Sequence, residues 1–202
     1  APDAILVSAH QQHTNKAIPV TEPWQPGDAP VADAMATSKP GIALGILSAD
    51  CAPVLMADGD AGVIGAAHAG WRGALDGVTD ALIAAMIELG AKAHNISAAV
   101  GPCIQQESYE VGPEFRERFI AADAGNADLF AAGPKPGHEM FDLPGYLMVR
   151  LRASALGDLV KLGVDTYPDD SGYFSYRRCC HQGISQYGRA LSVITLAGET
   201  SP

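Results

Sequence analysis

The chain has 202 residues, of which 48% are hydrophobic and 18% are charged. This composition is typical of a folded protein with a substantial core, and it indicates one large α/β domain or two small ones. The net charge of −10 argues against a nucleic-acid or anionic-membrane partner, because neither would find a basic surface to bind.

The four cysteines (Cys51, Cys103, Cys179 and Cys180) form neither a metal-knuckle spacing nor an obvious disulfide framework. Adjacent residues close a disulfide only with an awkward backbone, so Cys179 and Cys180 are expected to be two thiols. The apolar runs are too short to span a membrane, and the first residues lack a basic and then apolar export signal. We therefore expect a cytoplasmic protein.

Short apolar runs bounded by turn formers predict strands in the first third of the chain, over residues 4–8, 41–48, 53–57 and 62–67. Residues 74–89 then carry apolar side chains at intervals of three and four, which predicts an amphipathic helix that ends at Gly90. A strand therefore meets a helix at the turn Gly-Trp-Arg-Gly of residues 70–73.

The second half of the chain predicts a buried strand over residues 96–100 and a helix over 113–121. Residues 131–145 are rich in proline and glycine and are expected to form a loop within the domain. Helical periodicity follows through Leu147 and Leu151 and ends at Gly163. Another turn-rich segment, residues 167–178, precedes a last predicted strand at 191–196.

His68 stands where an apolar run ends in glycines, so its side chain is expected to face a cleft. Arg72 and the free backbone amides at the start of the following helix make the same turn a candidate anion site. The alternative is a tight turn with a hydrogen-bonded histidine and no ligand.

Two further strand ends carry reactive groups. Asp50 and Cys51 follow the strand at 41–48, and Cys103 follows the strand at 96–100. A free cysteine in such a place is most often a small core residue. Together with His68, however, these strand ends predict one shared site.

The chain resembles a known family through an ordered series of motifs: SADCAPVL (48–55), HAGWRG (68–73), GPCI (101–104), YEVGPE (109–114), FDLP (141–144), FSYRR (174–178) and Gly188-Arg189. The resemblance spans about residues 8–194. The family is that of the multicopper polyphenol oxidoreductase or laccase-domain proteins. Its members are described as zinc-dependent purine nucleoside phosphorylases with adenosine deaminase activity.

The resemblance implies a single domain over residues 1–202 with four layers, α/β/β/α, in a fold shared with deamidating bacterial toxins. Function must still be argued from the site. The family's members begin some tens of residues earlier, which leaves open whether a segment precedes residue 1. After FSYRR this chain also reads CCHQGISQYGR (179–189) in place of a short threonine-glycine-arginine turn.

The resemblance further implies that His68 and Cys103 are ligands of one zinc ion, with copper as the alternative metal. The family's third ligand is a histidine in the helix after GPCI, where this chain has the apolar Ile120. We therefore expect His138 to replace it, with His13 as another candidate. Scattered histidines do not supply the several copper sites that a laccase needs.

Purine nucleosides and phosphate are the expected partners. The proposed phosphate ligands are Arg72, Arg177 and Arg189, although Arg177 and Arg178 could equally be a solvated surface pair. Tyr176 or Phe174 is expected to stack on the base, and His13 to contact the substrate. Asp50 is the proposed proton shuttle.

Three functions remain open at this point. The first is phosphorolysis with deamination of adenosine. The second is hydrolytic editing of peptidoglycan precursors, either with zinc or with Cys51 as a thiolate nucleophile paired with His68. The third is a catalytically degenerate, metal-binding member of the family. The chain is expected to be a monomer or a weak homodimer.

Overall fold

The computed structural model describes residues 3–197. Its centre is a six-stranded sheet in the order β11-β7-β5-β6-β3-β2. These strands are β2 (Ala17–Pro19), β3 (Ala34–Thr37), β5 (Ala52–Asp58), β6 (Val63–Ala69), β7 (Ser97–Val100) and β11 (Leu159–Lys161). Every residue of β6 is buried, because this strand is covered on both of its faces.

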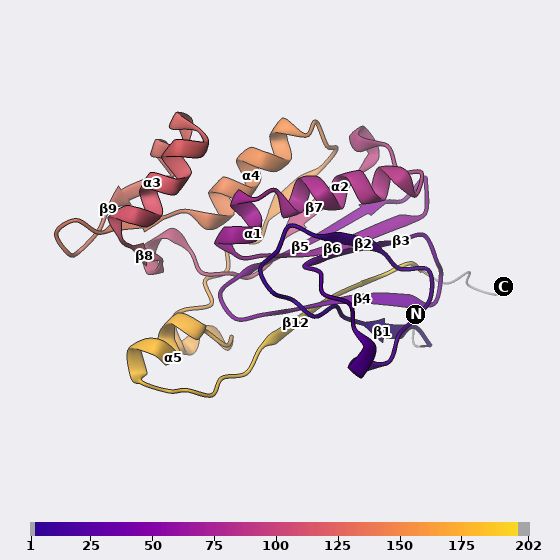
Figure 1. The fold of residues 1–202 in the computed structure, drawn as a ribbon, viewed down its shortest axis with the longest axis horizontal. Coiled ribbons are helices and arrows are strands. Elements are labelled where there is room, and N and C mark those ends of the chain that lie inside the picture. The colour runs from indigo at the N-terminus through magenta and orange to yellow at the C-terminus, as the bar shows by residue number, and fades with distance from the viewer. Residues whose placement is uncertain (1–2, 198–202) are drawn as a thin grey trace.

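A second sheet covers one face of the first (Figure 1). It contains β1 (Ile5–Val7), β4 (Ile42–Ser48) and β12 (Ala190–Thr195). The central strand β4 is parallel to β1 and antiparallel to β12. Leu44 and Ile46 of β4 pack against Met35 and Ile64 of the large sheet, which gives an apolar core between the two sheets.

Helices cover the opposite face of the large sheet (Figure 1). They are α1 (Trp71–Leu75), α2 (Val78–Glu88) and α4 (Leu143–Ala153). A further helix, α3 (Pro113–Ala122), lies at the end of this layer, to the left in Figure 1. A small third sheet of β8 (Glu110–Val111), β10 (Glu139–Phe141) and β9 (Phe130–Ala132) lies beside α3. On the side of the second sheet, α5 (Tyr176–Gln182) lies beyond the end of β12.

The expected α/β class is confirmed, with helices on one face of the large sheet and a second sheet on the other. The predicted early strands appear as β1, β4, β5 and β6, and the later ones as β7 and β12. All four cysteines are free thiols, as expected for Cys179 and Cys180. No helix between residues 3 and 197 has both the length and the apolar character needed to cross a membrane.

Several predicted boundaries were wrong. The helix expected over 74–89 is divided at Gly77, whose φ of 90° is left-handed and incompatible with a continuous helix. The loop expected at 131–145 contains the β9–β10 hairpin. The helix expected to reach Gly163 ends at Ala153, followed by Ala155 with φ 50° and then by β11. The turn-rich segment at 167–178 runs into α5, which Ser175 caps by accepting a hydrogen bond from the Arg178 amide.

Helix α2 packs so closely on β6 that a side chain at Gly65 has no room. A Cβ added there would lie 2.7 Å from Leu82 Cδ1 and 2.8 Å from Met86 Sδ, both fully buried. We expect Gly65→Ala to lower the free energy of unfolding by about 1–3 kcal/mol through overpacking. Urea denaturation measures this, with Gly59→Ala in the open β5–β6 turn as the control that should change little. Equal effects of the two substitutions would contradict the close approach.

Candidate active site and metal centre

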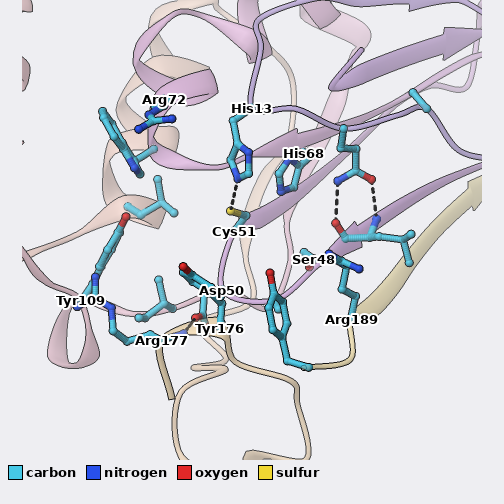
Figure 2. A pocket seen from close by; sticks show the side chains of 18 of the residues that line it. His13, Ser48, Asp50, Cys51, His68, Arg72, Tyr109, Tyr176, Arg177 and Arg189 are labelled. Atoms are coloured by element: carbon cyan, nitrogen blue, oxygen red, sulfur yellow. Dashed lines mark hydrogen bonds between the residues drawn. The ribbon is translucent and has the colours of Figure 1, made fainter. Parts of the chain in front are cut away.

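A cleft of about 750 Å³ opens where β4 and β6 end and β5 begins. Four segments that are distant in the sequence line it: the loop after β1, the β4–β5 turn, the β6–α1 turn and the region around α5. Two of the three strand ends expected to share a site, those that carry Asp50-Cys51 and His68, therefore meet here. Ionisable groups dominate its centre (Figure 2).

His13, Cys51 and His68 form the centre of the cleft. One potential ligand atom from each lies within 4.8 Å of the others. The Cys51 sulfur is 3.7 Å from His13 Nε2, and the two imidazole rings stand edge to face with centroids 4.9 Å apart. Figure 2 shows the three side chains directed toward one another. His13 was expected only as a substrate contact or as a substitute ligand, and the structure brings it into this group.

A buried carboxylate supports the group from behind. His68 Nδ1 lies 2.8 Å from Asp33 Oδ1, and His68 is 4% exposed. The backbone amide of His13 donates to the same oxygen at 3.0 Å. Burial opposes ionisation of Asp33, but hydrogen bonds from His68, Thr14 and Gln12 hold its pKa well below its usual range. Asp33 is therefore a fixed negative charge next to the histidine pair.

This arrangement creates a charged pair in the metal-free protein. Burial alone lowers the pKa of His68, yet its hydrogen bonds to Asp33 and Cys51 raise it to about 9. Burial alone raises the pKa of Cys51, yet hydrogen bonds and charge from His13 and His68 lower it to about 7. A thiolate on Cys51 beside an imidazolium on His68 therefore predominates between about pH 7 and pH 9. Below this range Cys51 is protonated, and above it His68 loses its charge.

Alkylation tests the lowered pKa of Cys51. In metal-free protein, the rate of iodoacetamide labelling at Cys51 should rise with a midpoint near pH 7, against about 8.5 for an ordinary cysteine. The substitution His68→Gln should move this midpoint upward, because it removes a hydrogen bond and a positive charge. Peptide mass spectrometry separates Cys51 from the other thiols. An ordinary midpoint in the wild-type protein would contradict the charged pair.

The donor set of His13, Cys51 and His68 fits a soft or borderline metal. Two imidazoles and one thiolate are ligands that Zn²⁺ prefers, and three protein ligands at a cleft leave a position for water or substrate, as in catalytic zinc sites. Copper accepts the same donors. Among residues 3–197 this is the one group of three or more such ligands, so several copper sites have no counterpart in that part of the chain.

The other two expected ligands lie elsewhere. Cys103 is 0% exposed in the core, its sulfur accepts a hydrogen bond from Gln105, and burial raises its pKa to about 12. It has the character of the small core residue that was the alternative interpretation. His138 belongs to the β9–β10 hairpin and lines a separate hollow formed by residues 132–139. The structure therefore gathers a different set from His68, Cys103 and His138.

Asp50 lines the cleft, but its carboxylate is occupied. It accepts hydrogen bonds from Thr166 Oγ1 at 2.7 Å, Ser175 Oγ at 3.0 Å and the Arg177 amide at 2.6 Å. Asp50 is 8% exposed and has a φ of 80°, which is unusual for a residue other than glycine. These contacts fasten the start of α5 to the β4–β5 turn. They do not support a proton shuttle, because each carboxylate oxygen is already held by a donor.

Three arginines line the cleft, each stacked on an aromatic ring. The guanidinium carbons of Arg72, Arg177 and Arg189 lie 5.0, 5.1 and 5.4 Å from the ring centroids of Trp71, Tyr109 and Tyr187, respectively. Arg72 and Arg189 stand on opposite sides of Cys51 (Figure 2). The cleft is thus rich in positive charge although the chain carries −10, which favours an anionic ligand. Tyr176, also at the cleft, packs against Tyr187 with its ring tilted by 56°.

The sequence profile of the family described as multi-copper polyphenol oxidoreductase laccase matches residues 1–197. The chain belongs to this family. Its cleft residues His68, Arg72 and Arg177 lie within the motifs that carried the resemblance, and so does Cys51.

Individual proteins and one solved structure are also similar to this chain. A purine nucleoside phosphorylase of Rickettsia prowazekii is 39% identical over 83% of this chain and 69% of its own length. A purine nucleoside phosphorylase of Deinococcus radiodurans is 40% identical over 81% of this chain and 61% of its own. The crystal structure of a Neisseria meningitidis protein superposes with a TM-score of 0.84 at 30% identity, covering 96% of this chain and 76% of that one.

Sequence reasoning missed Asp33, Trp71, Tyr109 and Tyr187 as parts of this site. Asp33 lies in VADAMAT, where a lone aspartate within an apolar run was a usable signal, because an unpaired charge is rarely buried. Tyr109 and Trp71 lie inside recognised motifs. Tyr187 follows a stretch that departs from the family pattern, and no local feature of the sequence distinguishes it.

Proposed function

We propose that this chain is a metal-dependent purine nucleoside phosphorylase that acts in the cleft around His13, Cys51 and His68. One observation carries the proposal: the same cleft joins three soft-metal donors to three arginines. Phosphorolysis needs an anion held against the ribose C1′ while the purine leaves, and this arrangement suits that requirement. The names of relatives at 39–40% identity support the same activity.

The arginines would hold inorganic phosphate. Arg177 is the best placed, because its amide is fixed by Asp50 and its Nη1 donates to the Glu110 carbonyl at 2.6 Å, which orients the guanidinium. Arg72 and Arg189 are exposed at the cleft and complete a positive surface. Guanidinium groups fixed before the reaction stabilise developing negative charge without reorganising.

Aromatic residues would hold the purine. Tyr176 is 52% exposed and lies 5.2 Å, centroid to centroid, from Tyr187. Both line the cleft, so a base can stack on either ring. We propose Tyr176 as the main contact, which keeps its expected role but places it at the first residue of a helix.

His13, Cys51 and His68 would hold zinc, with copper as the alternative metal. Bound zinc supplies Lewis-acid chemistry, polarising a substrate oxygen or activating water. The second possibility extends the proposed activity to adenosine deamination, which requires water and no phosphate. In that reaction the aromatic residues would still hold the purine, and the two histidines and the thiolate would stay deprotonated as ligands.

A hydrolase is the second candidate function. Asp33, His68 and Cys51 form a series in which a carboxylate holds the imidazole, and His13 and His68 together lower the pKa of the thiol to about 7. This is the arrangement of a cysteine nucleophile with its base. Such a site would hydrolyse an amide, as in the editing of peptidoglycan precursors, without phosphate or metal.

Product analysis separates these functions. Purified protein loaded with one equivalent of zinc should convert inosine, guanosine and adenosine to free base and ribose 1-phosphate only when phosphate is present. Inosine formed from adenosine without phosphate would reveal the deaminase. Removal of zinc with a chelator should abolish both activities. Amide hydrolysis that survives chelation and is lost in Cys51→Ala would instead support the hydrolase, and absence of all turnover would support a degenerate metal-binding protein.

A further inference from the structure

Asp33 connects the two histidines of the cleft. Its side chain is 0% exposed. Oδ1 accepts from His68 Nδ1 at 2.8 Å and from the His13 amide at 3.0 Å. Oδ2 accepts from the Gln12 amide at 3.1 Å, and from the amide and hydroxyl of Thr14 at 2.7 and 2.8 Å. One carboxylate therefore joins the loop of residues 12–14 to strand β6, two segments that are far apart in the sequence.

The contacts on the loop fix the direction of His13. This residue has a φ of 60°, which a residue with a side chain adopts at a cost. Three consecutive amides, those of residues 12–14, converge on Asp33 and offset that cost through charge-assisted hydrogen bonds. The His13 side chain is exposed and has no other anchor among its described contacts than Cys51 and the His68 ring. The orientation of its ring therefore depends on Asp33.

The contacts on β6 fix His68. The Asp33 carbonyl accepts from the His68 amide at 2.7 Å, while its carboxylate holds Nδ1. With Nδ1 engaged, Nε2 is the nitrogen left for a ligand in the cleft. A carboxylate behind a histidine sets its tautomer and ring orientation in metal sites in the same way.

We propose that Asp33 is a positioning residue that aligns both His13 and His68 on one metal ion. The inference rests on the proposed function, because it takes these histidines and Cys51 as the metal ligands. Replacing Asp33 should misorient two ligands together while leaving Cys51 in place. The expected loss of zinc affinity in Asp33→Asn is therefore about 10–100-fold or more, the range seen for outer partners of metal ligands.

Zinc alone is the probe, titrated into metal-free protein in competition with a chromophoric chelator. Asp33→Asn is compared with Asp58→Asn, a matched control. Asp58 is also 0% exposed and accepts three backbone amide hydrogen bonds, but it lies at the opposite end of β5 from Cys51. We expect weaker zinc binding in Asp33→Asn only. Absorption spectra of cobalt(II)-loaded Asp33→Asn add a readout that a folding defect would not give. The charge-transfer band of the Cys51 thiolate should remain, while the ligand-field bands, which report the ligand geometry, should differ from those of the wild-type protein.

A triple substitution, compared with the double histidine variant, tests whether Asp33 acts through the histidines. Adding Asp33→Asn to His13→Gln/His68→Gln should weaken zinc binding no further than the two histidine substitutions do. If Asp33→Asn does not fold, the histidine ¹⁵N NMR spectrum of the zinc-loaded wild-type protein provides the test. In that spectrum His68 should carry its proton on Nδ1. A proton on Nε2 would overturn the inference, and so would a folded Asp33→Asn protein with unchanged affinity and cobalt spectrum. Zinc loss in Asp33→Asn in a protein that shows no nucleoside turnover would support the positioning role and refute the proposed function.

Discussion

Replacing Cys51 with alanine should remove zinc binding and nucleoside phosphorolysis together, whereas replacing Cys103 with alanine should leave about one zinc per chain. The reason is geometric: Cys51 lies 3.7 Å from His13 Nε2 in the cleft, and Cys103 is a buried thiol bonded to Gln105. Loss of one of three ligands should lower activity by more than the ~10–100-fold typical of outer partners.

Elemental analysis and phosphate-dependent release of hypoxanthine from inosine measure the two effects. Cys103→Ala should instead lower the free energy of unfolding by about 1–2 kcal/mol, since it leaves a void in the core. Denaturation curves therefore distinguish a structural defect from a lost ligand. Zinc lost from Cys103→Ala but retained in Cys51→Ala would restore the ligand set implied by the family resemblance.

Replacing Arg178 with alanine should lower the free energy of unfolding by about 2–4 kcal/mol. Its Nη1 donates to the carbonyls of Thr166, Tyr167 and Pro168, and its Nη2 donates to that of Tyr173. The side chain is 15% exposed, so it is not part of the solvated pair considered from the sequence. Removing it leaves these carbonyls without a charged donor.

Thermal and urea unfolding measure this loss, with Arg152→Ala as the control. Arg152 is exposed on α4 and should change stability by less than about 0.5 kcal/mol. The affinity for phosphate should also fall in Arg178→Ala, because Arg178 fixes the loop that positions the start of α5, where Tyr176 and Arg177 line the cleft. Equal stabilities of the two variants would show that the carbonyls find other partners.

The sequence predicted the parts of the site that depend on local patterns. His68 and Arg72 could be placed because an apolar strand ends in glycines at the start of a helix, and Cys51 because it follows another strand end. These features depend only on residues that are close together in the sequence. The strands β1, β4, β5, β6, β7 and β12 were predictable for the same reason, whereas the short strands β2, β3 and β11 toward the edges of the large sheet were not predicted.

Which residues meet at the centre of the cleft was not predictable in this way. Whether Cys51 or Cys103 faces the cleft depends on how β4 and β7 are placed in different sheets, which no local spacing encodes. His13 enters the site through Asp33, a contact across 20 residues. Asp50 looked like an acid at an active site, but its partners come from residues 166–177, more than a hundred positions away. Long-range pairing decided each of these cases.

The second sheet, formed by β1, β4 and β12, has a consequence for the order in which the protein folds. Its central strand β4 pairs with β12, and the Thr195 hydroxyl donates to the Ile42 carbonyl across 153 residues. Contacts of such separation close late, because the chain entropy of a long loop must be overcome first. A chain emerging from the ribosome therefore cannot complete this sheet, or bring Tyr187 and Arg189 to the cleft, until β12 (Ala190–Thr195) has been synthesised. Nascent chains that lack β12 should accordingly expose the apolar face of β4, the stage at which chaperone binding is most useful.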